Sequence, residues 1–450
     1  MRLNEHNGAT KAFNPDSKNN IPSFAERSLQ EAAVWIQNGK YSQQLSNPSL
    51  TGGDMPDGEL KDFRFSSDVE RLSALAVSGE GEYTVENANI ELSGFGVSDF
   101  TSRGAGAAVV DGGTLTLKKV NISTHGAGRA ATIATEGSTL RVYDSTLSTD
   151  GGPLPSDYVP VIGPGMMEPP YPLGLSGTCR THLSMDHSKS YFYNCDFYAD
   201  SWGAISTDSS GGWLYLEVND SRINVPGNGY GTYADNGCHN VFNNCDFVVG
   251  GLLGIQDGNS SIEMNEVNAF SFGRGFLLHG GLEDWIDTGI VDISGSRIET
   301  VNETFLCKST NIDLYVKGSE LVSHNGVILR TMITDDEHYA EFKCTGKNCY
   351  GVQATFDSMK LEGDIVCDDT ERKTMIYLHD TELSGAITGY PCLTLSGSSK
   401  WLATEDSEVY IMPGTDIDAI DALENVNLKV RSPGCHGLLE LPSGGYMIAE

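Results

Sequence analysis

A row of ionisable side chains recurs at the ends of short apolar segments in the middle of the chain. The segments AISTD, TYAD, GIQD, FLLH, FLCK and VILR end in Asp208, Asp235, Asp257, His279, Lys308 and Arg330. His279 stands where acids give way to cations, and a histidine that titrates near neutral pH suits acid–base catalysis. We expect Lys308 and Arg330 to stabilise developing negative charge. Asp235 and Asp257 would orient or protonate the substrate.

The same row has a structural explanation. Asp is common at turns, and opposite charges on neighbouring strands neutralise one another without any catalytic role. Asp111 and Glu136 fit as earlier members of the row. If the last residue of each segment points inward, the row is a buried polar stack. The alternation of apolar residues leaves these explanations open.

Short β-rich segments repeat along most of the chain and would position this row. Each has alternating apolar residues, a polar Asn, Asp or Gly turn and an apolar anchor. The anchors recur every 22 to 28 residues, with two longer intervals of 50 and 40, at Ile122, Leu147, Phe197, Ile223, Phe247, Phe270, Ile298, Leu321, Leu361 and Leu383. A repeat of this length without helical periodicity is one coil of a solenoid, and the leucine-rich pattern LxxLxLxxN is missing. We predict an all-β fold, a right-handed parallel β-helix with coils stacked in register.

The two ends of such a stack need covers, because an exposed strand edge invites aggregation. Residues 20–40 have a capping box at Ser23 and Glu26, apolar residues at helical spacing and Gly39 at the end, which predicts an amphipathic capping helix. The predicted divisions are an N-terminal extension with this helix, the β-helix and a C-terminal closing segment, at residues 1–70, 71–400 and 401–450.

The repeat resembles that of the right-handed parallel β-helix proteins typified by pectin lyase and polygalacturonase, over about residues 75–400. The resemblance implies the fold and, as a starting expectation, polysaccharide chemistry. It implies no catalytic residue, because the polygalacturonase motifs Asn-Thr-Asp, Asp-Asp, Gly-His-Gly and Arg-Ile-Lys are missing. The calcium and arginine motifs of pectate lyases are missing too.

Two long insertions begin beside the row, at 149–178 and 331–350. Loops that leave one edge of a sheet build walls around what that sheet presents, which favours a binding groove there. Residues 153–175 are rich in proline and apolar side chains and form either a lid or a strap on the outside of the coils. We expect substrate contacts from this loop and from residues beside the row, namely Tyr158, Met166, Met167, Tyr171, Asp208, Trp202, Tyr230, Tyr233, Phe276 and Trp285.

Composition excludes several partners and favours a secreted protein. The 450 residues have 29 basic and 61 acidic side chains and a net charge of −32, which argues against nucleic acid and anionic membranes. No run reaches the ~18 apolar residues of a membrane span. The sequence starts with a polar stretch, as if a leader had been removed, and has Asn-x-Ser/Thr sequons at Asn121, Asn219, Asn259 and Asn302.

The ten cysteines have no CxxC spacing, which disfavours zinc and allows disulfides. Cys344 and Cys349 are predicted to tie one insertion. Cys367 and Cys392 lie about one coil apart and could bridge. Cys195 and Cys245 share a repeat position two coils apart, ~9.6 Å, which is too far for a disulfide.

These patterns predict a secreted β-helix enzyme that performs acid–base elimination or dehydration, a lyase, in a groove on one face. An isomerase or cyclase acting on a small apolar compound under residues 153–175 is an alternative. A non-catalytic glycan-binding or adhesin-like protein is a third possibility. We expect a small-molecule or glycan ligand and no metal or other cofactor, although Asp208, Asp235 and Asp257 could together hold Ca²⁺. The oligomeric state is left open.

Overall fold

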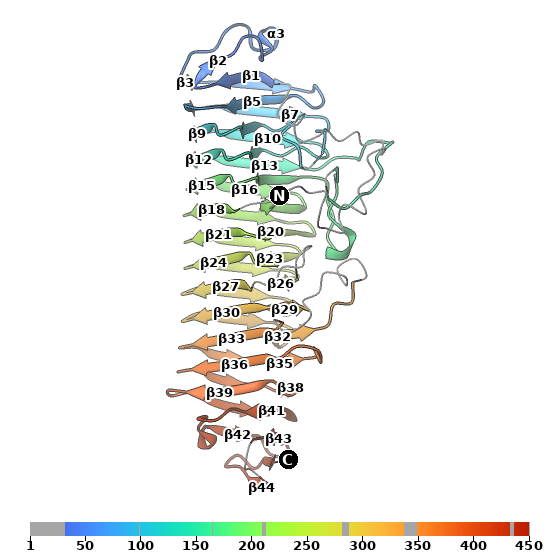
Figure 1. Cartoon of the computed structure of the whole chain (residues 1–450), viewed down its shortest axis with the longest axis vertical. Helices are drawn as coiled ribbons and strands as arrows, with labels where there is room; N and C mark the ends of the chain where they lie inside the picture. Colours follow the sequence, from blue (N-terminus) through green and yellow to red (C-terminus); the bar gives the residue numbers. More distant parts are fainter. Residues whose placement is uncertain are drawn as a thin grey trace. The chain divides into compact units, whose positions relative to one another are not determined.

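The structure is a computed structural model of the whole chain. It describes residues 32–98, 100–163, 165–208, 213–280, 288–336, 349–432 and 436–449. These residues belong to two compact units, unit 1 from Met1 to Gly251 and unit 2 from Leu252 to Glu450. In Figure 1 each unit is a stack of β-strand rungs, blue to green in unit 1 and yellow to red in unit 2. The protein is all-β, with parallel sheets in the repeating order of a parallel β-helix.

Each coil of unit 1 contributes one strand to each of three sheets. The order in sheet A is β2 (Lys40–Tyr41), β1 (Ala32–Gln37), β5 (Ser73–Ser78), β8 (Ala107–Val110), β11 (Thr132–Ala134), β14 (Arg180–Met185), β17 (Trp202–Asp208) and β20 (Gly229–Ala234). Sheet B has β3 (Glu59–Lys61), β6 (Glu82–Glu86), β9 (Thr114–Lys118), β12 (Thr139–Tyr143), β15 (Lys189–Tyr193), β18 (Leu214–Asn219) and β21 (Cys238–Asn243). Sheet C has β4 (Arg64–Ser67), β7 (Asn89–Ser93), β10 (Asn121–His125), β13 (Thr146–Asp150), β16 (Asp196–Ala199), β19 (Arg222–Val225) and β22 (Asp246–Val249).

Unit 2 is built in the same way. Its sheet A has β23 (Leu252–Asp257), β26 (Arg274–His279), β29 (Phe305–Lys308), β32 (Val327–Met332), β35 (Asp364–Cys367) and β38 (Ile387–Thr388). Its sheet B has β24 (Ser261–Asn265), β27 (Gly289–Ser294), β30 (Ile312–Lys317), β33 (Val352–Asp357), β36 (Thr374–His379), β39 (Cys392–Ser396), β41 (Ser407–Ile411), β43 (Asn427–Arg431), β45 (Tyr446–Ala449) and β44 (Gly437–Glu440). The third side is formed first by β25 (Asn268–Ser271), β28 (Arg297–Thr300) and β31 (Glu320–Ser323), then by β34 (Lys360–Glu362), β37 (Glu382–Ser384), β40 (Lys400–Ala403) and β42 (Ile420–Ala422).

The predicted anchors form inward stripes. In sheet C of unit 1 the in-register column is Ile90, Ile122, Leu147, Phe197, Ile223 and Phe247, all buried. In unit 2, Ile298 pairs with Leu321 and Leu361 with Leu383. Phe270 is an exception, because Ala269 takes the position opposite Ile298. The ring of Phe270 lies on the other face, against Phe272.

The polar turns between sheets B and C adopt the left-handed conformation at one position per coil. Asp144, Asn194, Asp220 and Asn244 all have φ between 50° and 53°. Asn and Asp tolerate this conformation better than other residues with a side chain. The Asn194 amide donates to the Asp144 carboxylate and the Asn244 amide to that of Asp220, each at 2.7 Å. The side chains of these turns are therefore hydrogen-bonded in pairs between neighbouring coils.

The position after each of these turns alternates between serine and cysteine. It is occupied by Ser145, Cys195, Ser221 and Cys245, and the backbone N–H of Cys195 donates to the Ser221 hydroxyl at 2.9 Å. Cys195 and Cys245 are buried free thiols separated by Ser221, as the predicted register requires. We call this column the Ser/Cys ladder.

The predicted disulfide between Cys367 and Cys392 is wrong, because both are free thiols. Cys367 is in β35 of sheet A, opposite the inward-facing Thr331, whereas Cys392 begins β39 of sheet B. One coil of sequence therefore separates two positions on different sheets. Cys344, the predicted partner of Cys349, lies outside the described residues.

The predicted capping helix is also wrong in the part of residues 20–40 that the structure describes. Residues Ala32–Gln37 form β1, which is buried and pairs in parallel with β5, whereas residues 20–31 lie outside the described range. Asn38 and Gly39 both have positive φ and turn the chain into the antiparallel β2. An Asn-Gly pair at positive φ is a hairpin signal, and here it outweighs the helical spacing of the apolar residues. The described helices are the short α3 (Pro48–Thr51), η1 (Tyr171–Leu173) and η3 (Ile417–Ala419), and among the described residues no helix could cross a membrane.

Candidate active site on sheet A

The centre of the predicted row is in register in unit 2. Asp257 of β23 pairs with His279 of β26, and His279 pairs with Lys308 of β29. The next residue in this row is Met332 rather than Arg330, because Arg330 stands opposite Leu306. A shift of two residues keeps a side chain on the same face of a strand, so Arg330 is displaced along the sheet and not turned away from it.

The row lies on the outer face of sheet A. Leu278 and Cys307 are neighbours of His279 and Lys308 along their strands and are buried. Thr331, which pairs with Cys307, is also buried and exchanges a hydrogen bond with Thr374 of sheet B across the interior. Side chains alternate along a strand, so His279, Lys308 and Arg330 point outward. This excludes the inward-facing polar stack.

His279 is held as a neutral imidazole. Only 4% of its surface is exposed, and burial lowers its pKa to about 4, with the positive charge of Lys308 acting in the same direction. Its Nδ1 lies 3.1 Å from the Gly280 carbonyl oxygen, which can only accept, so Nδ1 carries the proton. Nε2 is then the nitrogen with the basic lone pair. A carboxylate oxygen of Asp257 lies 3.7 Å from Nδ1.

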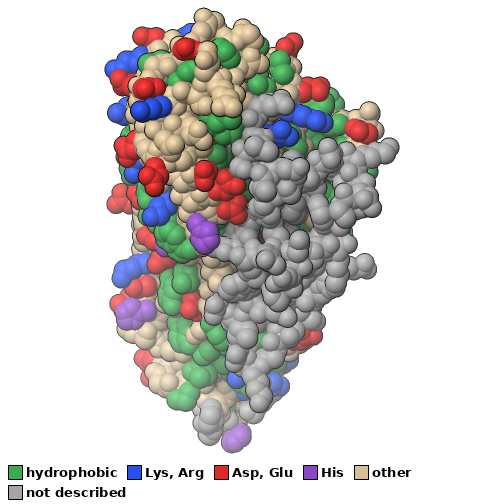
Figure 2. All heavy atoms as spheres, turned by 45° about the horizontal axis from the view of Figure 1, so that its top comes forward, with side chains coloured by type: hydrophobic (Ala, Val, Ile, Leu, Met, Phe, Trp, Pro, Cys, Tyr) green, Lys and Arg blue, Asp and Glu red, His purple; other side chains and the backbone are tan. Residues whose placement is uncertain are grey.

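The two cations of the row are ion-paired. The Lys308 ammonium lies 2.6 Å from the exposed carboxylate of Asp335 and lowers the pKa of that group. Arg330 lies 2.7 Å from Asp368 and 3.6 Å from Glu303. An anionic substrate would have to compete with Asp335 for Lys308. In Figure 2 acidic (red) and basic (blue) side chains are interspersed over the described part of the visible surface.

Asp208 and Asp235 belong to unit 1. They follow Thr207 and Ala234, which pair in sheet A. Asp208 forms an ion pair with the buried Arg180. Among the described residues, no three His, Cys, Asp or Glu side chains form a group able to hold a metal ion.

The predicted aromatic contacts in unit 1 are packed in a cluster. Trp202, Tyr230 and Tyr233 are buried. The Arg180 guanidinium lies over the Trp202 ring at 5.3 Å, and the Tyr230 hydroxyl is 2.6 Å from that of Ser206. These rings therefore support the outer face of unit 1 and present little surface to a ligand.

Phe276 is a core residue. It is fully buried and its ring stacks on Phe305 at 5.4 Å inside unit 2. The alternation that places His279 outside places Phe276, three positions earlier, inside. Trp285 lies outside the described residues.

The loop 153–175 packs on the coils of unit 1. Met166 and Met167 are buried, and the Met167 methyl group fills the space over Gly128. The Met167 N–H donates to the Tyr158 hydroxyl at 3.0 Å. Tyr171 is 73% exposed. Because His279 is in unit 2, a cover over His279 by this loop stays a prediction.

Comparison with known proteins does not add to these observations. No protein-family model matches the chain, and no significant match is found among curated proteins.

A partly exposed aromatic strip was missed by the sequence analysis. On the outer face of sheet B in unit 1, Tyr215 lies 5.7 Å from Tyr191, 6.0 Å from Trp213 and 5.6 Å from His239, ring centre to ring centre. Trp213 is 53% exposed. We call these four residues the aromatic strip. The sequence signal for this strip is an aromatic residue at the same outward position of aligned repeats, as in YFYNC and WLYLEV. The sequence analysis interpreted the apolar residues of these repeats only as core residues.

Proposed function

We propose that the protein is an acid–base enzyme of lyase type, with His279 as the proton-accepting residue. One observation carries this proposal: a neutral imidazole stands in register beside a lysine on the outer face of one sheet. A general base must be deprotonated at the operating pH, and burial keeps His279 so; the pKa of about 4 also makes it a weaker base than an ordinary histidine. The resemblance to β-helix proteins of the pectin-lyase type agrees with this chemistry but does not specify the substrate.

The reaction that fits is elimination from a carboxylate that has an oxygen leaving group on the β-carbon. Nε2 of His279 removes the proton next to the carboxylate, and Lys308 stabilises the negative charge that develops on the carboxylate oxygens. The electron pair of the broken C–H bond forms the double bond as the β C–O bond breaks. The proton on Nε2 passes to the departing oxygen. Asp257, close to Nδ1, favours the transient imidazolium.

The test is a panel of such substrates, from uronate oligomers to small hydroxy acids, assayed by the ultraviolet absorbance of the new double bond. We expect His279→Gln to lower kcat by about 100-fold or more, the usual contribution of a general base. His379→Gln removes an exposed histidine elsewhere in unit 2 and should leave kcat unchanged. Lys308→Met should lower kcat, and Lys308→Arg should restore part of it. Full turnover by His279→Gln would refute the proposal.

A glycan-binding function is the second candidate, and the aromatic strip favours it. A row of partly exposed aromatic rings on the outer face of one sheet offers stacking surfaces for sugar rings. The cyclase alternative has no comparable support, because Met166 and Met167 of its predicted lid pack on unit 1.

Glycan-array binding tests the second candidate. The double variant Trp213→Ala/Tyr215→Ala should weaken binding by about tenfold or more, since each stacked ring contributes ~1 kcal/mol. Phe272→Ala removes an exposed ring of unit 2 and serves as the control. Unchanged binding by the double variant would exclude the strip.

A further inference from the structure

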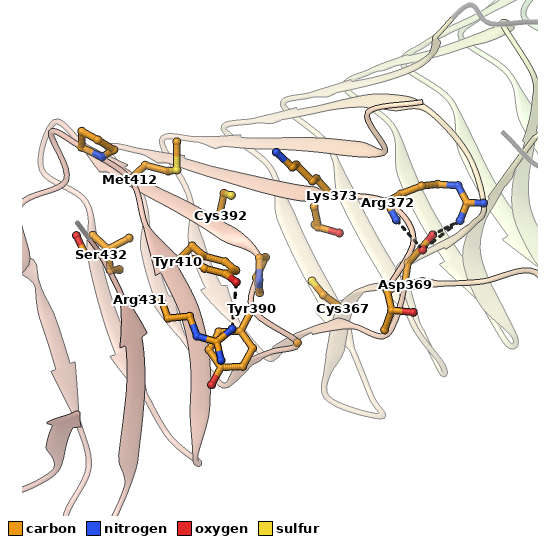
Figure 3. Close-up of a pocket in the computed structure, with 16 residues that line it drawn as sticks. Cys367, Asp369, Arg372, Lys373, Tyr390, Cys392, Tyr410, Met412, Arg431 and Ser432 are labelled. Carbon is orange, nitrogen blue, oxygen red and sulfur yellow. Dashed lines mark hydrogen bonds and ion pairs between the residues drawn. The ribbon is translucent and has the colours of Figure 1, made fainter. Parts of the chain in front are cut away.

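A groove of about 890 Å³ opens in unit 2, several coils beyond Lys308. It lies where the connections between β35 and β36 and between β38 and β39 meet the ends of β41 and β43. Figure 3 shows its lining residues. We call it the Tyr/Arg groove, after Tyr390, Tyr410 and Arg431.

One wall is a guanidinium stacked on the ring of Tyr390 and next to Tyr410, and the two rings lie 5.6 Å apart, centre to centre. The Arg431 guanidinium lies 3.8 Å from the centre of the Tyr390 ring and 5.5 Å from that of Tyr410, and it donates to the Tyr410 hydroxyl at 3.0 Å (Figure 3). The strand register produces this arrangement, because Cys392, Tyr410 and Arg431 are consecutive partners on the outer face of sheet B. A guanidinium fixed by stacking loses little entropy when it binds a carboxylate.

The groove is positively charged in a strongly acidic protein. Its lining includes three cations, Arg372, Lys373 and Arg431, and one carboxylate, Asp369. Asp369 is committed to the buried Arg372 through contacts of 2.8 and 3.1 Å (Figure 3). The charges of the described lining residues therefore sum to +2, since 3 − 1 = 2, in a chain of net charge −32, and the carboxylate of Glu371 lies next to the lining, 3.2 Å from Arg372.

The remaining lining is apolar and suits a ring. The Tyr410 side chain is partly exposed, and Pro391, Met412 and Pro413 line the groove near it. Flat apolar surfaces next to a cation recognise a ring that has an acidic group, because the ring stacks while the acid pairs with the guanidinium.

We propose that the Tyr/Arg groove binds a small carboxylate attached to a ring, at a site separate from His279. The carboxylate pairs with Arg431 in the field of Lys373, and the ring rests against Tyr410. Both an aromatic acid and a uronic acid have this chemistry. The proposal does not depend on the lyase function.

Cys392 provides a native reporter. It is partly exposed, lines the groove and neighbours Tyr410 in the sheet. Cys367 lines the groove as well, but burial raises the pKa of its thiol to about 12. Iodoacetamide should therefore alkylate Cys392 and spare Cys367, and peptide mass spectrometry separates the two.

The experiment measures alkylation of Cys392 in the full chain with benzoate, galacturonate, or the neutral analogues benzamide and galactose. At a carboxylate concentration of ten times Kd we expect a roughly tenfold slower reaction, and no change with the neutral analogue. Protection by benzoate alone assigns an aromatic acid, and protection by galacturonate alone assigns an acidic sugar. Protection by neither carboxylate, or equal protection by the neutral analogues, overturns the proposal.

Variants separate binding from folding. Arg431→Met and Tyr410→Leu should each abolish protection, Arg431→Lys should retain part of it, and Lys360→Met, an exposed lysine elsewhere in unit 2, should leave it intact. Thermal melting identifies any variant that fails to fold. Protection that survives in folded Arg431→Met or Tyr410→Leu overturns the proposal. His279→Gln should keep full protection, so failure of the lyase proposal and failure of this one give different results.

Discussion

Two buried histidines show how the environment sets the chemistry of a residue. His279, on the outer face of sheet A, has a pKa of about 4, and His182, in the interior of unit 1, has a pKa of about 3. Burial is the main cause in both. His182 is hydrogen-bonded to Thr132 and Ser184 on its two ring nitrogens, each at 2.9 Å, and its ring meets Phe192 edge-on. Its position indicates a core role, whereas His279 faces outward.

His182 makes stability fall in acid. Its pKa rises from about 3 in the folded state to the ordinary 6.5 in the unfolded state, so the unfolded chain binds a proton more readily between these values. The stability is complete above pH 6.5 and is lost as pH falls toward 3. Between pH 7 and 5 the loss from His182 should be about 2 kcal/mol. Urea unfolding at both pH values should show a smaller difference for His182→Gln than for the wild type, and an equal difference would contradict this assignment.

At the scale of elements, one arginine ties together the loops beside sheet A. Arg129 is buried and donates to the carbonyl oxygens of Leu72, Gly94 and Gly104, each at 2.9 Å. It also donates to the Val69 carbonyl at 3.1 Å. The loops that leave successive coils thus share one donor group, which satisfies carbonyls that the ladders of the sheets do not use.

Arg129→Leu should destabilise unit 1 by about 3 kcal/mol or more, because it leaves several buried carbonyls without a donor. Arg129→Lys should rescue little, since an ammonium cannot span these carbonyls as a planar guanidinium does. Arg141→Leu, at an exposed arginine of β12, should change the melting temperature only slightly. Thermal melting of the three variants checks the prediction, which fails if Arg129→Leu melts like Arg141→Leu.

The sequence predicted the periodic features better than the local ones. The anchors and the row at Asp257, His279 and Lys308 follow from the coil period, which the stack repeats. Arg330 was misaligned by two residues because strand length varies between coils, and such a shift leaves the face unchanged. The aromatic strip and the Tyr/Arg groove were missed because they combine outward residues of neighbouring coils, which a search for core periodicity passes over.

For the whole molecule, the composition bears on the proposed location more than the cysteines do. The net charge of −32 and the sequons fit the proposed secretion, and Asn121 is exposed on β10. The buried cysteines Cys179, Cys238 and Cys307 do not contribute to that argument. Secretion is therefore a proposal that rests on the sequons.

An antiparallel pair of strands lies at one end of the described strands of each unit. The pair is β1 with β2 in unit 1 and β45 with β44 in unit 2. A parallel sheet that stops without such a strand presents unpaired backbone groups to other chains. Deleting residues 436–450 removes β44 and β45 and leaves one edge of β43 unpaired. We expect this variant to self-associate, measured by light scattering at increasing concentration. A monodisperse variant would show that the edge is protected in another way.

The Ser/Cys ladder has a mechanical consequence. Neighbouring coils place equivalent Cα atoms ~4.8 Å apart, which is within the range that a disulfide spans, so Ser221→Cys would put a thiol beside both Cys195 and Cys245. When the ends of a stacked protein are pulled, its coils can detach one after another, because each coil is held mainly by its neighbours. A disulfide at this point would stop the detachment of coils at a known coil. The length of chain released before the stop would report how many coils had detached. One substitution in the Ser/Cys ladder would therefore introduce a reporter of how many coils detach under force.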